Sequence, residues 1–192
     1  MLLSRPVILA SASPRRHELL RQLVEEFEIV VAGVDEDALT CPDPWETAQR
    51  LALAKARAVA EGRPDALVIG GDTVVALALD GGYQQLTKPV DAEDAVRILS
   101  LLSGREHVVI TGVALVWAEG SLVGFDTTRV RFRSLLEAEI REYVATGEPM
   151  DKAGAYGIQG LGGTIVESFE GSISNVVGLP LERLGELLNL VG

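Results

Sequence analysis

The segment Ser11-Ala12-Ser13-Pro14-Arg15-Arg16 joins an apolar run to a helical pattern and carries two hydroxyls and two guanidinium groups. Ser13 has the chemistry of an N-cap, and Pro14 suits the first helical position because it has no amide hydrogen to leave unpaired. A helix N-terminus carries unpaired N–H groups and partial positive charge, so hydroxyls and arginines beside it form a cradle for phosphate groups. The alternative is a structural cap with solvated arginines. The segment alone leaves both interpretations open.

Asp72 stands in a long apolar run that begins at Ala66 and ends at Leu77, interrupted only by residues 70–73. Such a run indicates a central strand that is buried on both faces. A buried carboxylate is costly unless it is hydrogen-bonded, paired with a cation or bound to a metal, and the glycines before it leave room for a ligand. Asp72 is therefore the strongest catalytic candidate. The alternative is a structural aspartate that loop amides satisfy.

Two further charged positions are ambiguous from the pattern alone. Lys55 shares a helical face with Ala52 and Val59, so its ammonium group either reaches the rim of the protein on an apolar stem or points into a cleft as a fixed cation. Residues 35–37 form an acidic loop just after a predicted strand at 27–31. This loop is either a solvated turn or part of a metal site.

A glycine-rich segment, residues 151–163, departs from the regular pattern late in the chain. It holds five glycines and shows almost no periodicity, so we expect a loop that lies close against another group. No apolar strand leads into it and no helix of adequate length follows, which excludes a dinucleotide-binding fingerprint.

Composition narrows the class of protein. We expect residues 1–192 to form one domain, because this length with 47% hydrophobic and 23% charged residues is ordinary for a globular fold. The net charge of −11 argues against a nucleic-acid partner, whereas a small electropositive pocket can still hold an anion. The single cysteine excludes a disulfide framework, and two distant histidines argue against a histidine metal site. No apolar run has the length of a membrane span and no signal peptide is recognised, so we expect a cytoplasmic protein without a membrane partner.

Hydrophobic periodicity and capping signals predict alternating strands and helices. Strands are expected at 7–10, 27–31, 66–77, 107–117 and from 164. The strand at 107–117 is joined through residues 118–120 to a second strand that contains 130 and 132, and we expect the two to form an antiparallel pair. Helices are expected at 14–24, 44–61, 92–104, 134–147 and from 180, with Ser134 and Glu137 forming a capping box. Arg129, Arg131 and Arg133 alternate with apolar residues, which indicates a solvated face or a subunit contact.

Eight short motifs follow one another over almost the whole chain. They are Ser11-x-Ser13-Pro14-Arg15-Arg16, Asp35-Glu36, Lys55-Ala56, Gly70-x-Asp72-Thr73, Lys88-Pro89, Leu102-Ser103-Gly104, Asp151-Lys152-Ala153-Gly154-Ala155-Tyr156-Gly157-Ile158-Gln159-Gly160 and Val177-Gly178-Leu179-Pro180. Each is weak by itself. Their joint order resembles that of the Maf family of nucleoside triphosphate pyrophosphatases.

The resemblance implies an α/β fold of the Maf/ITPase-like kind: a twisted mixed β-sheet flanked by helices, with two lobes and an intervening cleft. It implies a homodimer, a divalent metal (Mg²⁺ or Mn²⁺) and cleavage of a nucleoside triphosphate between the α and β phosphates. By resemblance, Asp72 accepts the proton of the attacking water and touches the metal together with Glu36. The residues implied around the phosphates are Ser11, Ser13, Arg16, Lys55 and Lys88.

The resemblance also bears on base preference. Arg15, Thr73 and Gln159 are the combination seen in the branch similar to dTTP and UTP pyrophosphatases, whereas the branch acting on 7-methyl-GTP differs there. A primary amide at Gln159 can pair with the donor N3–H and the adjacent carbonyl of uracil or thymine. Gly71 stands where the family more often has alanine. Two other functions remain as alternatives to a dTTP and UTP pyrophosphatase. They are a pyrophosphatase for noncanonical purine triphosphates and a non-catalytic nucleotide-binding regulator.

Overall fold

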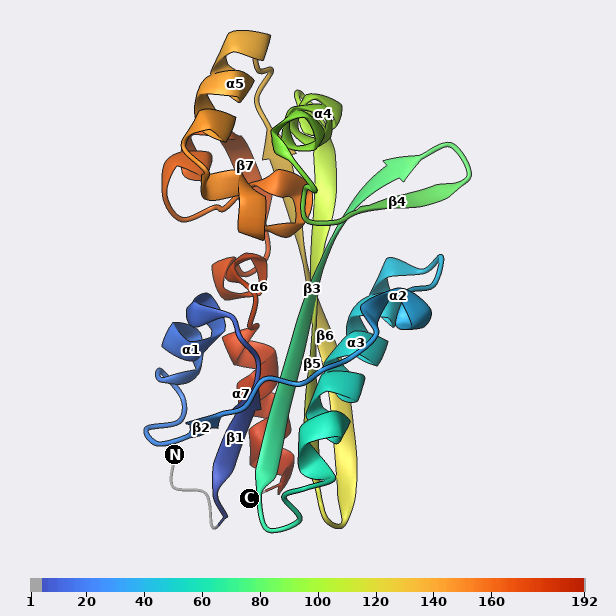
Figure 1. Cartoon of the computed structure of the whole chain (residues 1–192), viewed down its shortest axis with the longest axis vertical. Helices are drawn as coiled ribbons and strands as arrows, with labels where there is room; N and C mark the ends of the chain where they lie inside the picture. Colours follow the sequence, from blue (N-terminus) through green and yellow to red (C-terminus); the bar gives the residue numbers. More distant parts are fainter. Residues whose placement is uncertain (1–4, 192) are drawn as a thin grey trace.

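A mixed sheet of seven strands runs the length of the molecule in the computed structural model, which describes residues 5–191 (Figure 1). Its strands are β1 (Val7–Ala10), β2 (Glu28–Ile29), β3 (Leu67–Leu79), β4 (Gly82–Leu86), β5 (Glu106–Trp117), β6 (Gly120–Phe132) and β7 (Val166–Glu170). The order is β2-β1-β3-β5-β6-β7, with β4 paired to β3. Strand β1 is parallel to β2 and β3, and the other pairs are antiparallel. The predicted mixed α/β fold is therefore confirmed.

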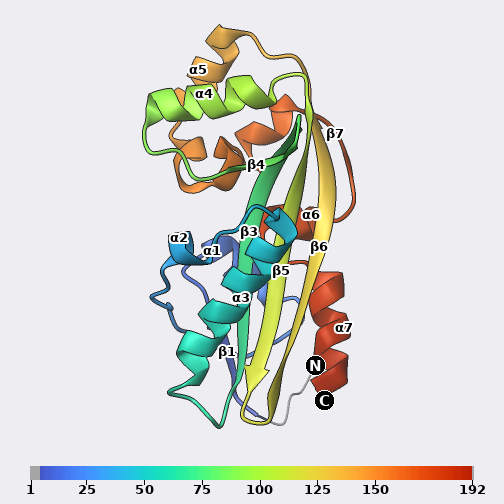
Figure 2. The same ribbon diagram turned by 90° about the vertical axis from the view of Figure 1, so that its right-hand side faces the viewer.

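Helices cover both faces of the sheet and one of its ends (Figure 2). They are α1 (Pro14–Leu20), α2 (Glu36–Leu39), α3 (Pro44–Ala60), α4 (Ala92–Leu102), α5 (Glu137–Ala145), α6 (Ile173–Val177) and α7 (Leu181–Val191), with 3-10 turns η1 (Glu148–Asp151), η2 (Ala153–Ala155) and η3 (Leu161–Ile165). No helix within residues 5–191 combines the length and the apolar character that a membrane crossing requires.

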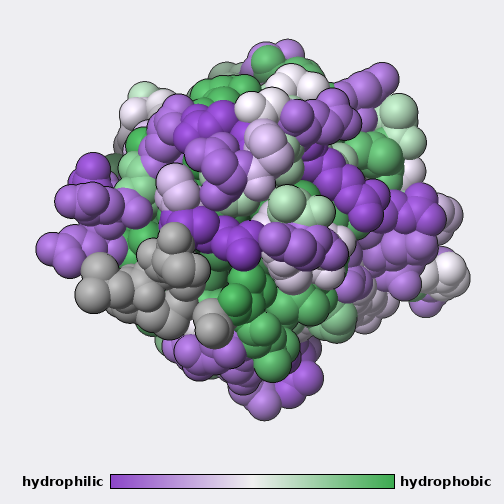
Figure 3. Space-filling model, turned by 90° about the horizontal axis from the view of Figure 1, so that it is seen from below, coloured by the Kyte–Doolittle hydropathy of each residue, from purple (hydrophilic) through white to green (hydrophobic). Residues whose placement is uncertain are grey.

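The long strands β3, β5 and β6 pass through two lobes (Figure 1). In the first lobe, α3 covers one face of the sheet and α1 and α7 cover the other, with separate apolar clusters on the two sides. In the second lobe, α4, α5 and the 3-10 turns pack on the opposite ends of these strands around Leu99, Phe132 and Tyr156. The end of the first lobe is mainly hydrophilic, with hydrophobic residues exposed between the polar ones (Figure 3). The predicted two-lobed architecture is confirmed.

Helix α3 lies directly on the sheet because both surfaces are small at the contact. Ala48 and Ala52 are fully buried on α3. A Cβ atom added at Gly70 of β3 would lie less than 3.0 Å from the carbonyl oxygen of Ala52, and one at Gly112 of β5 would lie equally close to that of Ala48. Because real Cβ atoms do not approach backbone oxygens so closely, these two positions require glycine for this docking.

Several local predictions differ from the structure. The strand expected at 27–31 is reduced to β2, because its partner β1 ends at Ala10. The acidic loop is helical in part, since Asp35 caps α2 by accepting from the Ala38 N–H. The N-cap of α5 is Leu136, two residues after the expected Ser134, because Glu139 accepts from the Leu136 N–H. The last strand starts at Val166, and the helix expected at 14–24 ends at Leu20. Neither β4 nor α6 was predicted.

Candidate functional site

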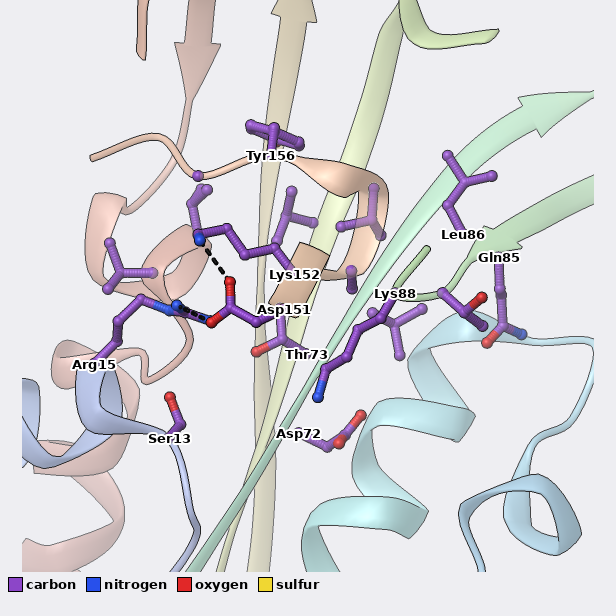
Figure 4. A pocket seen from close by; sticks show the side chains of 18 of the residues that line it. Ser13, Arg15, Asp72, Thr73, Gln85, Leu86, Lys88, Asp151, Lys152 and Tyr156 are labelled. Carbon is purple, nitrogen blue, oxygen red and sulfur yellow. Dashed lines mark hydrogen bonds and ion pairs between the residues drawn. The ribbon is translucent and has the colours of Figure 1, made fainter. Parts of the chain in front are cut away.

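A pocket of about 660 Å³ lies between the two lobes. Its lining comes from α1, α2 and α3 of the first lobe, from β3 and the segment after β4, and from residues 148–159 of the second lobe (Figure 4). The structure brings together in this lining the following predicted site residues: Ser13, Arg15, Arg16, Glu36, Lys55, Asp72, Thr73, Lys88 and Gln159. Ser11 is buried just behind them and does not line the pocket itself.

Lys55 joins the two candidate carboxylates. Its Nζ atom lies 2.6 Å from Asp72 Oδ1 and 2.7 Å from Glu36 Oε1. Lys55 of α3 reaches Asp72 of β3 across the close contact between these two elements. Asp72 pairs in register with Gly112 of β5. Of the two orientations that the sequence left open for Lys55, the structure therefore has the one that points into the cleft.

Strand β3 continues without a break through Asp72, which is 8% exposed. Burial raises the pKa of Asp72, although the positive charges of Lys55 and Arg16 act in the opposite direction. Burial also disfavours the charged form of Glu36, but its bond to Lys55 prevails and lowers the pKa of Glu36. The two carboxylates thus have different proton affinities in one site, the arrangement expected where one of them accepts a proton.

Arg16 ties the start of α1 to β3 and to the chain before α7. Its Nε atom donates to the carbonyl oxygen of Gly178 at 2.6 Å, and its Nη2 donates to Thr73 Oγ1 at 2.9 Å. Its Nη1 donates to Ser11 Oγ at 3.4 Å. The predicted N-cap is confirmed, since Ser13 Oγ accepts from the Arg16 N–H. Three of the five guanidinium N–H groups are therefore held by protein atoms, which fixes the orientation of the other two.

Arg15 reaches across the cleft to Asp151 on η1, with Nη1 and Oδ2 2.9 Å apart (Figure 4). Lys152 Nζ lies 2.6 Å from the other oxygen of that carboxylate. Partial burial favours the neutral acid, but the hydrogen bonds from Lys152 and Arg15 prevail and lower the pKa of Asp151 to about 2. This ion pair links α1 of the first lobe to the glycine-rich segment of the second.

The glycine-rich segment lies against the pocket, as its composition indicated. A Cβ atom added at Gly157 or Gly162 would lie less than 3.0 Å from a neighbouring group of the segment or of α5. The sequence did not single out Glu148 and Lys152, which also line the pocket. Lys152 stands in one of the motifs quoted above and Glu148 lies four residues before it, so closeness to the glycine-rich segment is the signal that could have found them.

The lining is balanced in charge, which corrects the expected electropositive pocket. Among the described residues that line it, five are basic (Arg15, Arg16, Lys55, Lys88 and Lys152) and five are acidic (Glu36, Asp37, Asp72, Glu148 and Asp151). The chain as a whole carries a net charge of −11. The pocket is therefore more positive than its surroundings without being positive itself.

The donor set fits a divalent cation that a bound ligand helps to hold. Within residues 5–191, no group of three or more His, Cys, Asp or Glu side chains is placed to hold a metal by itself. Glu36 and Asp72 nevertheless converge on one point, where both contact Lys55. Mg²⁺ is commonly bound through one or two carboxylates together with water and substrate phosphates. Two carboxylates and a phosphate-bearing ligand would satisfy that pattern.

The family of the chain follows from one comparison. Residues 6–191 match the family model described as Maf-like protein. The chain belongs to the Maf family. The Maf chain is 50% identical over 186 residues to the dTTP/UTP pyrophosphatase of Symbiobacterium thermophilum, covering 97% of this chain and 94% of that relative. It is 49% identical over 190 residues to the dTTP/UTP pyrophosphatase of Pelotomaculum thermopropionicum, covering 98% and 97%.

Solved structures share the fold at low sequence identity. The HAM1 protein from Coxiella burnetii superposes with a TM-score of 0.55 at 16% identity, over 96% of the Maf chain and 98% of that protein. The Ham1 protein of Staphylococcus aureus gives a TM-score of 0.50 over 67% of the Maf chain and 72% of that protein, at 14% identity. These two HAM1 proteins therefore share the overall fold of this chain.

Proposed function

We propose that this Maf protein is a nucleoside triphosphate pyrophosphatase that hydrolyses dTTP and UTP to the monophosphate and pyrophosphate. The observation that carries the proposal is the buried Asp72 carboxylate, held by Lys55 in a cleft between two lobes. The relatives that bear the name dTTP/UTP pyrophosphatase align over nearly the whole chain. The same site in this chain holds both acidic and basic groups suited to a triphosphate.

In the proposed reaction, water attacks a phosphorus atom in line with the departing pyrophosphate. Asp72 orients the water and accepts its proton, and its raised pKa suits that task because a more basic carboxylate holds the proton better. Lys55, Lys88 and Arg16 lie around the phosphates and neutralise their charge, and the Ser13 hydroxyl donates to them. Ser11, which does not line the pocket, supports Arg16 by accepting from its Nη1. A bound Mg²⁺ or Mn²⁺, held by Glu36 and Asp72, would supply further charge neutralisation.

We assign the preference for the base to Gln159, Arg15 and Thr73. The Gln159 side chain lines the pocket from the glycine-rich segment of the second lobe. Its amide offers an acceptor for N3–H and a donor for the neighbouring carbonyl of thymine or uracil. Cytosine presents an unprotonated N3 and an exocyclic amine, which mismatches part of that pattern unless the amide flips.

A panel of triphosphates tests the function directly. Purified protein with Mg²⁺ should release pyrophosphate from dTTP and UTP with higher kcat/KM than from CTP, ITP or 7-methyl-GTP. A higher value for ITP would favour a noncanonical purine pyrophosphatase. Nucleotide binding without pyrophosphate release would favour a regulator.

Four sequence predictions stand beside this proposal. They are the cytoplasmic location, the homodimer, the single domain over residues 1–192, and the absence of nucleic-acid and membrane partners. Sedimentation of the purified protein would test the homodimer.

A further inference from the structure

A tyrosine and a glutamate from one segment of the second lobe hold the loop that carries Gln159. Tyr143 lies on α5, and Glu148 begins η1. The Tyr143 hydroxyl donates to Glu148 Oε1 at 2.9 Å and accepts from the Gly157 N–H at 3.2 Å. We propose that Tyr143 and Glu148 form a positioning clamp that sets Gln159 for recognition of the base. The inference rests on the proposed function and names residues on which its specificity depends.

The carboxylate of Glu148 holds the other end of the same loop. Its Oε2 accepts from the Leu161 N–H at 3.1 Å, and its Oε1 accepts from the Gly162 N–H at 3.0 Å. The loop from Gly157 to Gly162 is therefore tied at its first and last residues to two side chains that also bond to each other. Gln159 lies between the two attachment points.

The polarity of the clamp is fixed by its surroundings. Tyr143 is buried, and burial followed by the nearby Glu148 carboxylate raises the pKa of its hydroxyl, which therefore keeps its proton. Burial opposes ionisation of Glu148, but hydrogen bonds from the Gly162 N–H and from Tyr143 prevail and lower its pKa. A charged acceptor thus faces three donors, and such bonds are stronger than those between neutral groups.

Glycine is required where the loop meets the clamp. A Cβ atom added at Gly162 would lie less than 3.0 Å from both the Tyr143 hydroxyl and the carbonyl oxygen of Gly157. Gly160 has a φ of 102°, and a Cβ there would lie 3.0 Å from Glu148 Oε2. The shape of the loop and the position of the clamp therefore depend on each other.

The Gln159 side chain is carried into the pocket by the loop. It is exposed at the pocket, and no described residue forms a hydrogen bond with its amide group. The loop backbone, and through it Tyr143 and Glu148, therefore sets where the Gln159 side chain starts and from which side it enters the pocket. A displacement of the order of 1 Å is enough to weaken a pair of hydrogen bonds to a base.

Glu148→Gln is the decisive variant, because it keeps the shape of the side chain and replaces one acceptor oxygen with an NH₂ donor. The new amide offers one acceptor oxygen, and its NH₂ must face either the Leu161 or the Gly162 N–H, so that donor meets donor. We expect the KM for dTTP and UTP to rise about tenfold with kcat within twofold of wild type, and the preference over CTP to fall. The inhibition constant of inorganic tripolyphosphate, which has no base, should stay within twofold.

Tyr143→Phe gives a second variant that keeps the buried ring and removes only the hydroxyl, and we expect the same pattern. Glu142→Gln is the matched control, because it removes an equal charge from an exposed position one residue before Tyr143. Thermal unfolding of every variant identifies any loss of the fold. The inference is overturned if the KM for dTTP is unchanged, or if affinity for tripolyphosphate falls by the same factor.

Amide hydrogen exchange tests the clamp independently of catalysis. In Glu148→Gln, the N–H groups of Leu161 and Gly162 should exchange at least tenfold faster, while those of β5 are unchanged. Unchanged exchange at both positions would rule out the clamp. A wild-type protein that releases no pyrophosphate from dTTP or UTP would instead refute the proposed function, with the exchange result still deciding the clamp.

Discussion

At the scale of single residues, the cleft depends on a carboxylate whose ionisation is opposed by burial and supported by a lysine. Asp72 could be identified from the sequence because a lone carboxylate in an apolar strand is costly without a partner. Its partner could not, since Lys55 lies 17 residues earlier and the pattern allowed it to point either way. The ion pair between Lys55 and Glu36 could not be predicted either, because it depends on how α2 packs against α3.

Asp72→Asn separates catalysis from binding. The amide keeps the shape but is a poor proton acceptor, so kcat for dTTP should fall by about 10²-fold or more. Lys55 retains its contact with Glu36, so the dissociation constant for dTTP, measured by calorimetry, should change less than about fivefold. Asp37→Asn, an exposed position in the same lining, is the charge-matched control. Wild-type turnover in Asp72→Asn would remove this residue from the chemistry.

Gln159→Glu tests recognition of the base. A carboxylate can accept from N3–H but repels the neighbouring carbonyl of thymine or uracil, because it has no donor to offer. We expect kcat/KM for dTTP and UTP to fall about tenfold relative to CTP. Gln22→Glu adds the same charge at an exposed position outside the pocket lining and should change no ratio. If kcat/KM for dTTP and UTP relative to CTP is the same in Gln159→Glu as in the wild type, another residue recognises the base.

At the scale of elements, local patterns predicted what local contacts decide. Helix α3 could be located from Asp43, whose side chain accepts from the Trp45 and Glu46 N–H groups, and from Pro44 at the first helical position. The start of α5 could not, because Ser134 matched the cap pattern while Glu139 made the observed bond. The docking of α3 on Gly70 and Gly112 also escaped prediction, since no window of sequence contains both surfaces.

Gly112→Ala tests the docking of α3. The added methyl group would meet the backbone of Ala48, which cannot rotate away, so the helix must shift from the sheet. We expect the free energy of unfolding in urea to fall by about 2 kcal/mol or more, together with loss of kcat as Lys55 moves from Asp72. Gly62→Ala is the control, because its nearest neighbour would be 4.0 Å away. Equal stability of the two variants would contradict the close packing.

His107 couples the packing of β5 to pH. Its ring is 2% exposed, bonds to the Tyr156 hydroxyl at 2.8 Å, and leaves Nδ1 without a partner among the described residues. Burial lowers the pKa of His107 from its ordinary value of 6.5 to about 4. The unfolded chain therefore binds the extra proton first, and stability is lost as pH falls from about 6.5 to 4.

Between about pH 6.5 and pH 4, the lowered pKa of His107 reduces the free energy of unfolding by about 3 kcal/mol. We expect the free energy of unfolding of the wild type to decrease from pH 7 to pH 4.5 relative to that of His107→Gln. Comparing the two proteins cancels the opposite contribution of Asp72, whose raised pKa stabilises the folded state toward low pH. Parallel curves for the two proteins would exclude His107 as the source.

At the scale of the whole molecule, the continuous strands β3, β5 and β6 join the lobes, and the ion pair of Arg15 and Asp151 bridges the cleft between them. The sequence supported two lobes and a cleft through the order of its motifs, and the structure has both. It misjudged the charge of the cleft, because Glu148 and Asp151 enter the lining from a segment far from Asp72 in sequence. Net charge cannot report such a balance, since it does not record which residues meet.

The ion pair of Arg15 and Asp151 is the contact by which α1 reaches the second lobe. Its side chains are 34% and 64% exposed, so Asp151→Asn should lower the free energy of unfolding by less than about 1 kcal/mol. Amide exchange of η1 and η2 should nevertheless quicken, because the glycine-rich segment loses its link to the first lobe. Glu186→Gln breaks a similar exposed pair with Arg183 inside α7, where it cannot affect the cleft. If both variants leave exchange at 148–155 unchanged, the pair does not restrain the cleft, and the strands alone set the distance between the lobes.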